Sequence, residues 1–252
     1  MAKIMNNKSW DDLAADYDKS VEDNQSPLVI NYLKEEIEIL KNLCEKHSRL
    51  NKNFSVIDMG AGTGRVVFAL DEKLRDDSID FLGIENSDLM LKYANQKNKL
   101  RSGFSKTSFL KHDLTDTNLS QNFDLKNANV VMCTYNTLGV VPSDKRQSFI
   151  DNMKIIAGKN GMVILTMFNG DDFGFVAPKM YHSMIPMIKK IDDDSFDEEN
   201  RVFHNSLGFR SQWFTKNEIN SLLDSTLDPL PINVIIGDTP KTFGNVFVHN
   251  VA

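Results

Sequence analysis

A glycine-rich segment that follows an acidic residue is the part of the sequence best suited to chemistry. It reads Gly60-Ala61-Gly62-Thr63-Gly64 and begins two residues after Asp58. Glycines permit a sharp turn and let a ligand approach the backbone without meeting a Cβ atom. Free N–H groups at the start of a following helix favour anionic groups. The Asp58 carboxylate suits a ligand with an ammonium group and would repel a pyrophosphate, so the segment predicts a site for a ligand that carries an ammonium group.

The spacing of the glycines argues against a dinucleotide site. Dinucleotide-binding loops have the pattern G-x-G-x-x-G, whereas this chain has G-x-G-x-G followed by Arg65. An arginine at the sixth position would crowd the close packing of helix and strand that the third glycine permits. No Gly-Lys-Ser/Thr follows, so the segment is not a P-loop. An NAD(P)-dependent oxidoreductase is therefore the disfavoured alternative.

Two further acidic residues follow predicted strands. Glu85 ends the apolar segment 80–85, roughly 20 residues beyond the loop, where a carboxylate binds ribose hydroxyls in doubly wound α/β folds. Asp113 comes shortly after the predicted strand 107–110. Because the carboxyl ends of parallel strands meet at one edge of a sheet, we expect both carboxylates near the glycine loop.

The segment Asp58-Met59-Gly60-Ala61-Gly62-Thr63-Gly64-Arg65 resembles the first motif of class I (Rossmann-like) S-adenosylmethionine-dependent methyltransferases. The resemblance implies an enzyme of the EC 2.1.1 class that uses S-adenosylmethionine and releases S-adenosylhomocysteine. It implies that Asp113 accepts a hydrogen bond from the adenine amino group, and that an N-terminal segment with Tyr17 closes over the ligand. The cofactor-binding residues expected on this basis are Tyr17, Asp58, Gly60, Ala61, Gly62, Arg65, Glu85, Asn86, Met90, Asp113, Leu114 and Cys133.

Short apolar segments predict the strands that position these residues. Two later apolar segments flank a turn with Asp238 and Pro240 and predict a final antiparallel hairpin. We expect an α/β fold with a doubly wound, seven-stranded, mostly parallel sheet whose last strand is antiparallel. The predicted strands are 54–57, 80–85, 107–110, 129–134, 162–168, 232–236 and 245–249.

The pattern changes after Phe168. The segment 169–214 does not read as a simple crossover helix, and we expect a small antiparallel β insertion between the fifth and sixth strands. Short strands are predicted there at 188–191, 201–206 and 208–213, around an acidic turn at 192–200. The predicted division is a helical lid (1–50), a cofactor-binding domain (51–168 and 215–252) and an inserted subdomain that covers the substrate (169–214).

The resembled family places its fourth motif beside the transferable methyl group, where this chain has Thr134-Tyr135-Asn136-Thr137. Enzymes that attack amide or exocyclic amino nitrogens of proteins and nucleic acids often have (Asn/Asp)-Pro-Pro-aromatic here, and this chain lacks the two prolines. The segment therefore favours a small-molecule acceptor, methylated at N or O, by direct in-line displacement. The candidate catalytic residues are Tyr135, Tyr181 and His182, and the candidate substrate-binding residues are Asn136, His204, Arg210 and Trp213.

The composition of the chain limits the kinds of partner that we expect. The formal net charge of −6 and the lack of a basic stripe disfavour a nucleic-acid partner. The 2 cysteines form no C-x-x-C pair, so no metal site is expected. We expect a cytoplasmic protein without a membrane partner, because the sequence has neither a signal-peptide core nor a run of transmembrane length. A protein or RNA substrate, a non-catalytic subunit that binds S-adenosylmethionine, and either a monomer or a homodimer remain open.

Overall fold

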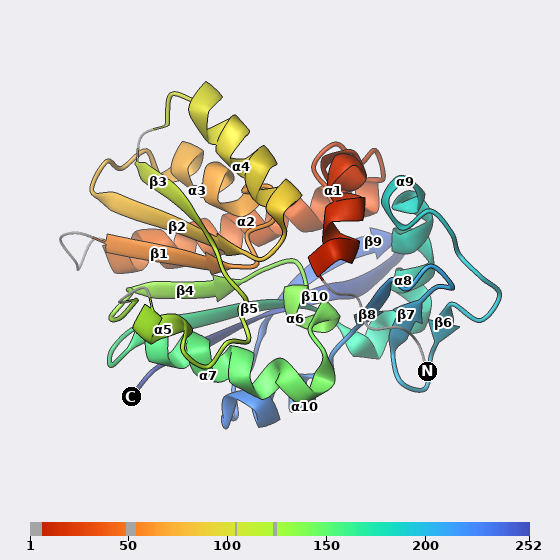
Figure 1. Ribbon diagram of the computed structural model, residues 1–252. Coiled ribbons are helices and arrows are strands. Elements are labelled where there is room, and N and C mark those ends of the chain that lie inside the picture. Colours follow the sequence, from red (N-terminus) through yellow and green to blue (C-terminus); the bar gives the residue numbers. More distant parts are fainter. Residues whose placement is uncertain (1–6, 49–53, 104, 123–124) are drawn as a thin grey trace.

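The computed structural model describes residues 7–48, 54–103, 105–122 and 125–252. Its centre is a seven-stranded sheet with the order β3-β2-β1-β4-β5-β10-β9 (Figure 1). Strands β1 to β5 are parallel, and β10 runs antiparallel to both β5 and β9. This arrangement confirms the predicted fold class. The strands are β1 (Phe54–Met59), β2 (Ile79–Glu85), β3 (Lys106–Lys111), β4 (Val130–Cys133), β5 (Met162–Phe168), β9 (Leu230–Ile236) and β10 (Thr239–Asn250).

Helices cover both faces of the sheet, and each face has its own apolar core (Figure 1). Alternate side chains of β1 point to opposite faces, so Val56 belongs to the core beneath α2 and α3 and Ile57 to the core beneath α7 and α10. Burial on both faces explains why the strands read as nearly continuous apolar runs. The helices around the sheet are α2 (Pro27–Ser48), α3 (Arg65–Leu74), α4 (Asp88–Leu100), α5 (Leu119–Asn122), α7 (Arg146–Ala157) and α10 (Lys216–Leu223).

The predicted antiparallel insertion is present between β5 and β9. Its three-stranded sheet has the order β6-β7-β8, with both pairs antiparallel. Two helices precede this sheet and lead the chain away from the end of β5 (Figure 1). The elements are η2 (Gly170–Asp172), α8 (Phe173–Ser183), α9 (Ile185–Ile188), β6 (Phe196–Asp197), β7 (Val202–His204) and β8 (Arg210–Gln212).

The expected strand at 188–191 is wrong, because Ile188 is the last residue of α9. The segment from Phe173 to Ser183, where no helix was predicted, forms α8, which contains Pro178. The two helices bury apolar side chains that recur every three or four residues, which is the period of a helix and not of a strand. These side chains are Phe173, Val176, Ala177, Met180, Met184 and Met187.

Shorter elements complete the rim of the sheet near the carboxyl ends of its strands. Helix α1 (Asn7–Ser20) lies beside α4 and α9, while α6 (Thr137–Val140) and η1 (Ser143–Lys145) follow β4 (Figure 1). Helix α10 begins with a capping box, in which the Thr215 and Glu218 side chains each accept a backbone N–H of the other residue. No helix in the described ranges combines the length and the apolar character that a membrane crossing requires.

Candidate functional site

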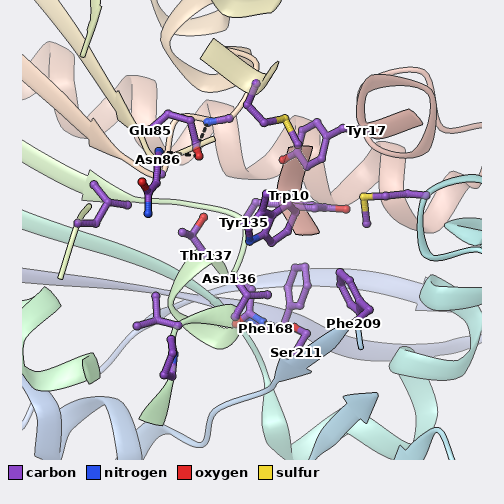
Figure 2. Close-up of a pocket in the computed structure, with 18 of the residues that line it drawn as sticks. Trp10, Tyr17, Glu85, Asn86, Tyr135, Asn136, Thr137, Phe168, Phe209 and Ser211 are labelled. Carbon is purple, nitrogen blue, oxygen red and sulfur yellow. Dashed lines mark hydrogen bonds between the residues drawn. The ribbon is translucent and has the colours of Figure 1, made fainter. Parts of the chain in front are cut away.

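A cavity of about 450 Å³ lies at the edge of the sheet where β1, β2, β4 and β5 end. Gly60, Glu85, Tyr135 and Phe168 line it, each from the end of a different strand. Figure 2 shows Glu85 on one side of the cavity and Phe168 on the other, with Tyr135 between them. The strand order reverses between β1 and β4, and doubly wound sheets bind their ligands at that reversal.

The glycine loop borders this cavity, and its backbone has conformations that glycine adopts without strain. Gly60 has φ 92° and Gly62 has φ 55°. A Cβ atom on Gly60 would lie 2.4 Å from Cγ2 of Thr137, so the close packing of the loop against α6 requires a glycine there. A Cβ atom on Gly62 would meet only the Tyr17 ring, at 3.8 Å. Gly62 therefore borders the space between the loop and α1.

Glu85 presents its carboxylate to the cavity in a fixed orientation. Oε2 accepts the Gly62 N–H at 2.9 Å, and Oε1 accepts the N–H groups of Asn86 at 2.8 Å and Ser87 at 2.9 Å. Burial raises the pKa of Glu85, and these three N–H groups oppose that rise. A carboxylate has about four acceptor positions, so one remains for a hydroxyl of a ligand.

Asp113 lines the same side of the cavity, together with Asn86, Met90 and Leu114. Its Oδ1 accepts from the backbone N–H and the hydroxyl of Thr115, at 2.9 and 2.8 Å. These contacts orient the carboxylate within the turn that follows β3. Five cofactor-binding residues predicted beyond the loop (Glu85, Asn86, Met90, Asp113 and Leu114) therefore surround one end of the cavity.

Asp58 and Arg65 lie beside the glycine loop, but they are not among the residues that line the cavity. The Arg65 side chain donates from Nη2 to Glu36 of α2 at 2.7 Å and stacks over the Tyr135 ring. Arg65 Nη1 and Asp58 Oδ1 are buried and make no hydrogen bond within the described residues. Burial raises the pKa of Asp58 to about 7. Of the other predicted cofactor residues, Ala61 and Cys133 are also buried outside the cavity lining.

The chain bends sharply after β4. Tyr135 and Asn136 both have positive φ, 49° and 60°, a conformation that is unfavourable for residues with a side chain. The Tyr135 N–H is accepted by Glu36 at 3.0 Å and by the Thr166 hydroxyl at 2.8 Å. The Asn136 amide donates to Ser211 Oγ and to the Gln212 carbonyl and accepts the Phe168 N–H. Its hydrogen bonds thus hold the ends of β4 and β5 against β8.

Helix α1 covers the cavity from one side and is held there by its acidic residues. Asp18 accepts from the Thr63 hydroxyl of the glycine loop at 2.6 Å and pairs with Lys97 of α4 at 2.8 Å. Asp11 accepts the Leu89 N–H at the start of α4 at 3.0 Å. Trp10 and Tyr17 of this helix both line the cavity (Figure 2).

The insertion covers the opposite side with apolar side chains. Met180 of α8, Met187 of α9 and Met184 between the two helices reach the cavity. Phe209 contacts the Trp10 ring edge-on, with centroids 6.3 Å apart. Tyr181 also lines the cavity, and its hydroxyl accepts from Nε1 of the buried Trp213 at 3.1 Å. The resulting wall is mainly apolar and aromatic. The sequence-based site lacked these methionines and Phe209; the helical spacing at 173–187 could have revealed the methionines.

Four predicted catalytic or substrate-binding residues lie outside the cavity lining. His182 is on the exposed side of α8, with Nδ1 2.6 Å from the Pro178 carbonyl oxygen. His204 and Arg210 line a separate polar groove, and Trp213 is buried behind Tyr181. Side chains alternate along β8, so Ser211 faces the cavity while Arg210 faces the groove. Tyr135, Asn136 and Tyr181 are the predicted acceptor residues that the structure brings together.

Comparisons with known proteins agree with this geometry. A family model described as a methyltransferase domain matches residues 50–227. The carboxy-S-adenosyl-L-methionine synthase of Desulfotalea psychrophila is 35% identical over 86 residues, which are 34% of this chain and 34% of that protein. The enzyme of the same name from Nautilia profundicola is 28% identical over 131 residues, 52% of this chain and 49% of that protein. The matches thus span between a third and a half of these relatives.

A solved structure with a bound product shows the same fold. The magnesium protoporphyrin IX methyltransferase of Synechocystis PCC 6803, crystallised with S-adenosylhomocysteine, superposes with a TM-score of 0.57. The two sequences are 14% identical, and the match covers 88% of this chain and 84% of that chain. This likeness concerns the fold alone.

The polar side chains around the glycine loop fit S-adenosylmethionine, the cofactor of this family. Glu85 and Asp113 accept hydrogen bonds at one end of the cavity, as the hydroxyls and the amino group of adenosine require. Asp58 Oδ1 and Arg65 Nη1, both buried and without a hydrogen-bond partner beside the loop, are an acceptor and a donor of the kinds that the ammonium and the carboxylate of the methionine part require. The chain therefore belongs to the methyltransferase-domain family of S-adenosylmethionine-dependent enzymes.

Proposed function

We propose that this protein transfers the methyl group of S-adenosylmethionine to a small molecule, at N or O, by direct in-line displacement. The observation that carries the proposal is the covered cavity. Trp10 and Tyr17 of α1 close one side, and Phe209 and Ser211 of the insertion close the other (Figure 2). A volume of about 450 Å³ is near the lower end of the range for sites of drug-sized ligands. The cofactor takes part of that volume, so the remaining space suits a small acceptor.

The cofactor supplies a methyl group that is already electrophilic, so the chain mainly has to position it and the acceptor. Glu85, fixed by three backbone N–H groups, accepts a ribose hydroxyl, and Asp113 accepts the adenine amino group. The bend at Tyr135 and Asn136 directs two cavity-lining side chains to the space between these carboxylates and the insertion. Holding two reactants within about 3–3.5 Å can supply much of the rate acceleration.

The proposed division of labour follows the predicted segments. The segment 1–50 is the lid, of which residues 1–6 and 49–50 lie outside the described ranges. The segments 51–168 and 215–252 bind the cofactor, and 169–214 covers the substrate. A protein or RNA substrate would have to reach the methyl group past both α1 and the insertion, which disfavours that alternative.

The relatives named carboxy-S-adenosyl-L-methionine synthase suggest a second possible product. Such a product carries an additional carboxylate close to the sulfonium, and a buried carboxylate requires a cation or several N–H donors. Lys145 of η1 is the one Lys or Arg among the described residues that line the cavity, and the lining residues that the insertion contributes include neither a Lys nor an Arg. The insertion therefore supplies no cation for a carboxylate that stays on the product, unlike an anion whose charge disappears in the transfer, and this favours methyl transfer.

An isotope-labelling experiment tests the proposal. The protein is incubated with S-adenosylmethionine that carries a deuterated methyl group and with a cell extract separated into small-molecule and macromolecular fractions. We expect labelled methyl groups in the small-molecule fraction and equal formation of S-adenosylhomocysteine, both measured by mass spectrometry. Label in protein or RNA would favour the macromolecular alternative, and a carboxylated S-adenosylmethionine would assign the activity of the relatives.

A further inference from the structure

The cavity has two chemically different ends. Glu85 ends β2 and Asp113 follows β3, on one side of β1, whereas Tyr135 follows β4 and Phe168 ends β5 on the other. Neighbouring strands are about 4.8 Å apart, so β2 is about 10 Å from β4, and β3 is about 14 Å from it. Both carboxylates that line the cavity therefore belong to the end that holds the adenosine. They are too far from the other end to take a proton from an acceptor there.

The acceptor end has no group suited to act as a base. Its titratable lining residues are Tyr135 and Tyr181, and burial raises the pKa of both hydroxyls, that of Tyr181 to about 12. Within the described part of the chain, no histidine, thiol or carboxylate lines this end. The nearby carboxylates, Asp58 and Glu36, are buried outside the lining, and Glu36 is paired with Arg65. The remaining titratable groups of the cavity are Tyr17, Glu85, Asp113 and Lys145.

The wall of the acceptor end selects against a cation. An ammonium group here would lose its hydration without gaining a carboxylate, and it would lie beside the positive sulfonium. The polar groups of Asn136 and Ser211 are already hydrogen-bonded to each other. The rest of the wall suits a ring or another flat apolar body: Trp10, Phe168, Met180, Met184, Met187 and Phe209.

We propose that the acceptor is an apolar, ring-bearing small molecule whose nucleophile is an acidic O–H or S–H group that loses its proton to water without a protein base. This inference rests on the proposed methyltransferase function, excludes its nitrogen acceptors and adds sulfur to its acceptor atoms. A lone pair of the resulting oxygen or sulfur anion forms the bond to the methyl carbon. The bond between that carbon and the cofactor's sulfur breaks, its electron pair stays on sulfur, and S-adenosylhomocysteine leaves. The charge of the anion and that of the sulfonium cancel in the transfer.

A series of small aromatic probes tests this acceptor class. Phenols and thiophenols whose ring substituents grade their acidity are compared with benzyl alcohol and benzylamine, which have similar shapes. Formation of S-adenosylhomocysteine is followed by mass spectrometry across pH, and its binding is measured separately by calorimetry. We expect transfer to the phenols and thiophenols, with rates that rise about tenfold per pH unit below the acceptor's own pKa and level off there. The midpoint of the pH–rate profile should therefore shift with the pKa of the acceptor.

Two substitutions of Met184 test whether a negative charge in the wall of the acceptor end hinders the transfer. Met184→Glu places a carboxylate at the apolar end, where it repels an anionic acceptor, and we expect transfer to fall about tenfold or more while S-adenosylhomocysteine still binds. Met184→Leu changes the shape of the same wall without the charge, and we expect a smaller loss. Equal losses in the two variants would count against an anionic nucleophile.

The outcomes separate this inference from the proposed function. Transfer to benzylamine or benzyl alcohol, with a pH midpoint that stays the same for different acceptors, would overturn the inference and leave the methyltransferase function intact. Binding of S-adenosylhomocysteine without transfer to any phenol or thiophenol would also overturn it. A protein that binds no S-adenosylhomocysteine would instead contradict the proposed function itself.

Discussion

Replacing Glu36 by glutamine should strongly destabilise the protein, although Glu36 does not line the cavity. The Glu36 side chain is 0% exposed and that of Arg65 is 10% exposed, and Nη2 of Arg65 lies 2.7 Å from Glu36 Oε2. Oε1 of Glu36 accepts from the Tyr135 N–H and from the hydroxyls of Tyr32 and Thr166. Glu36 thus joins α2 to α3, to β5 and to the bend after β4.

The size of the effect follows from the burial of this pair. In Glu36→Gln the amide oxygen can still accept the Tyr135 N–H, but the amide N–H₂ then faces the Arg65 guanidinium, and the arginine charge has no counter-ion. Breaking a buried ion pair from one side costs about 3–5 kcal/mol. In a protein of this size that corresponds to a fall in Tm of roughly 6–20 °C. Urea unfolding followed by circular dichroism measures the loss.

Two control variants make this prediction specific. Glu38→Gln on the same helix removes a half-exposed partner of Lys73, and we expect a change of less than about 1 kcal/mol. The double variant Glu36→Gln/Arg65→Met removes both charges, so it should recover much of the stability lost in Glu36→Gln. If Glu36→Gln were as stable as Glu38→Gln, the pair would not be desolvated and the reasoning would be refuted.

Three further predictions concern the loop and its carboxylates. Glu85→Gln should weaken S-adenosylhomocysteine binding by about 1.5–3 kcal/mol in calorimetry; unchanged affinity would contradict the ribose contact. Gly60→Val should abolish cofactor binding or folding, because its Cβ atom overlaps Thr137. Gly62→Ala should still fold, with a free energy of unfolding lower by about 1–2 kcal/mol because of the positive φ at this position. Equal effects of the two substitutions in thermal unfolding would mean that the loop packs differently. Burial raises the pKa of Asp58 from 3.8 to about 7, so the folded state binds this proton more tightly and stability falls as pH rises between these values. In Asp58→Asn the free energy of unfolding should therefore differ less between pH 5 and pH 8 than in the original protein. An unaltered pH dependence would count against a raised pKa of Asp58.

Local rules were sufficient to predict the parallel half of the fold. The strand ending at Glu85 and the fully buried strand 162–168 carry their own signals, because strands buried on both faces are apolar along nearly their whole length. The glycine spacing predicted the loop because positive φ at Gly60 and Gly62 is a local property. The capping box at Thr215 is equally local.

The acceptor end was harder to predict because it depends on contacts between distant segments. Asn136 was expected to touch the substrate, and the structure shows its amide bound to β8, 75 residues further along the chain. His204 and Arg210 were grouped with the cavity because they lie in the insertion, but the alternation of β8 turns Arg210 away from it. The role of Glu36 has no sequence signal either, since a glutamate in an amphipathic helix ordinarily faces water.

A crystal structure with S-adenosylhomocysteine would show whether the ends of β1 to β3 hold the cofactor and whether the insertion encloses the space for a small acceptor. We predict a ribose hydroxyl on Glu85, the adenine amino group on Asp113, and the sulfur facing the space between Tyr135, Met184 and Phe209. A sulfur that faced bulk solvent would contradict this placement, and so would a cofactor that lay elsewhere in the chain and left the Glu85 carboxylate without a ligand.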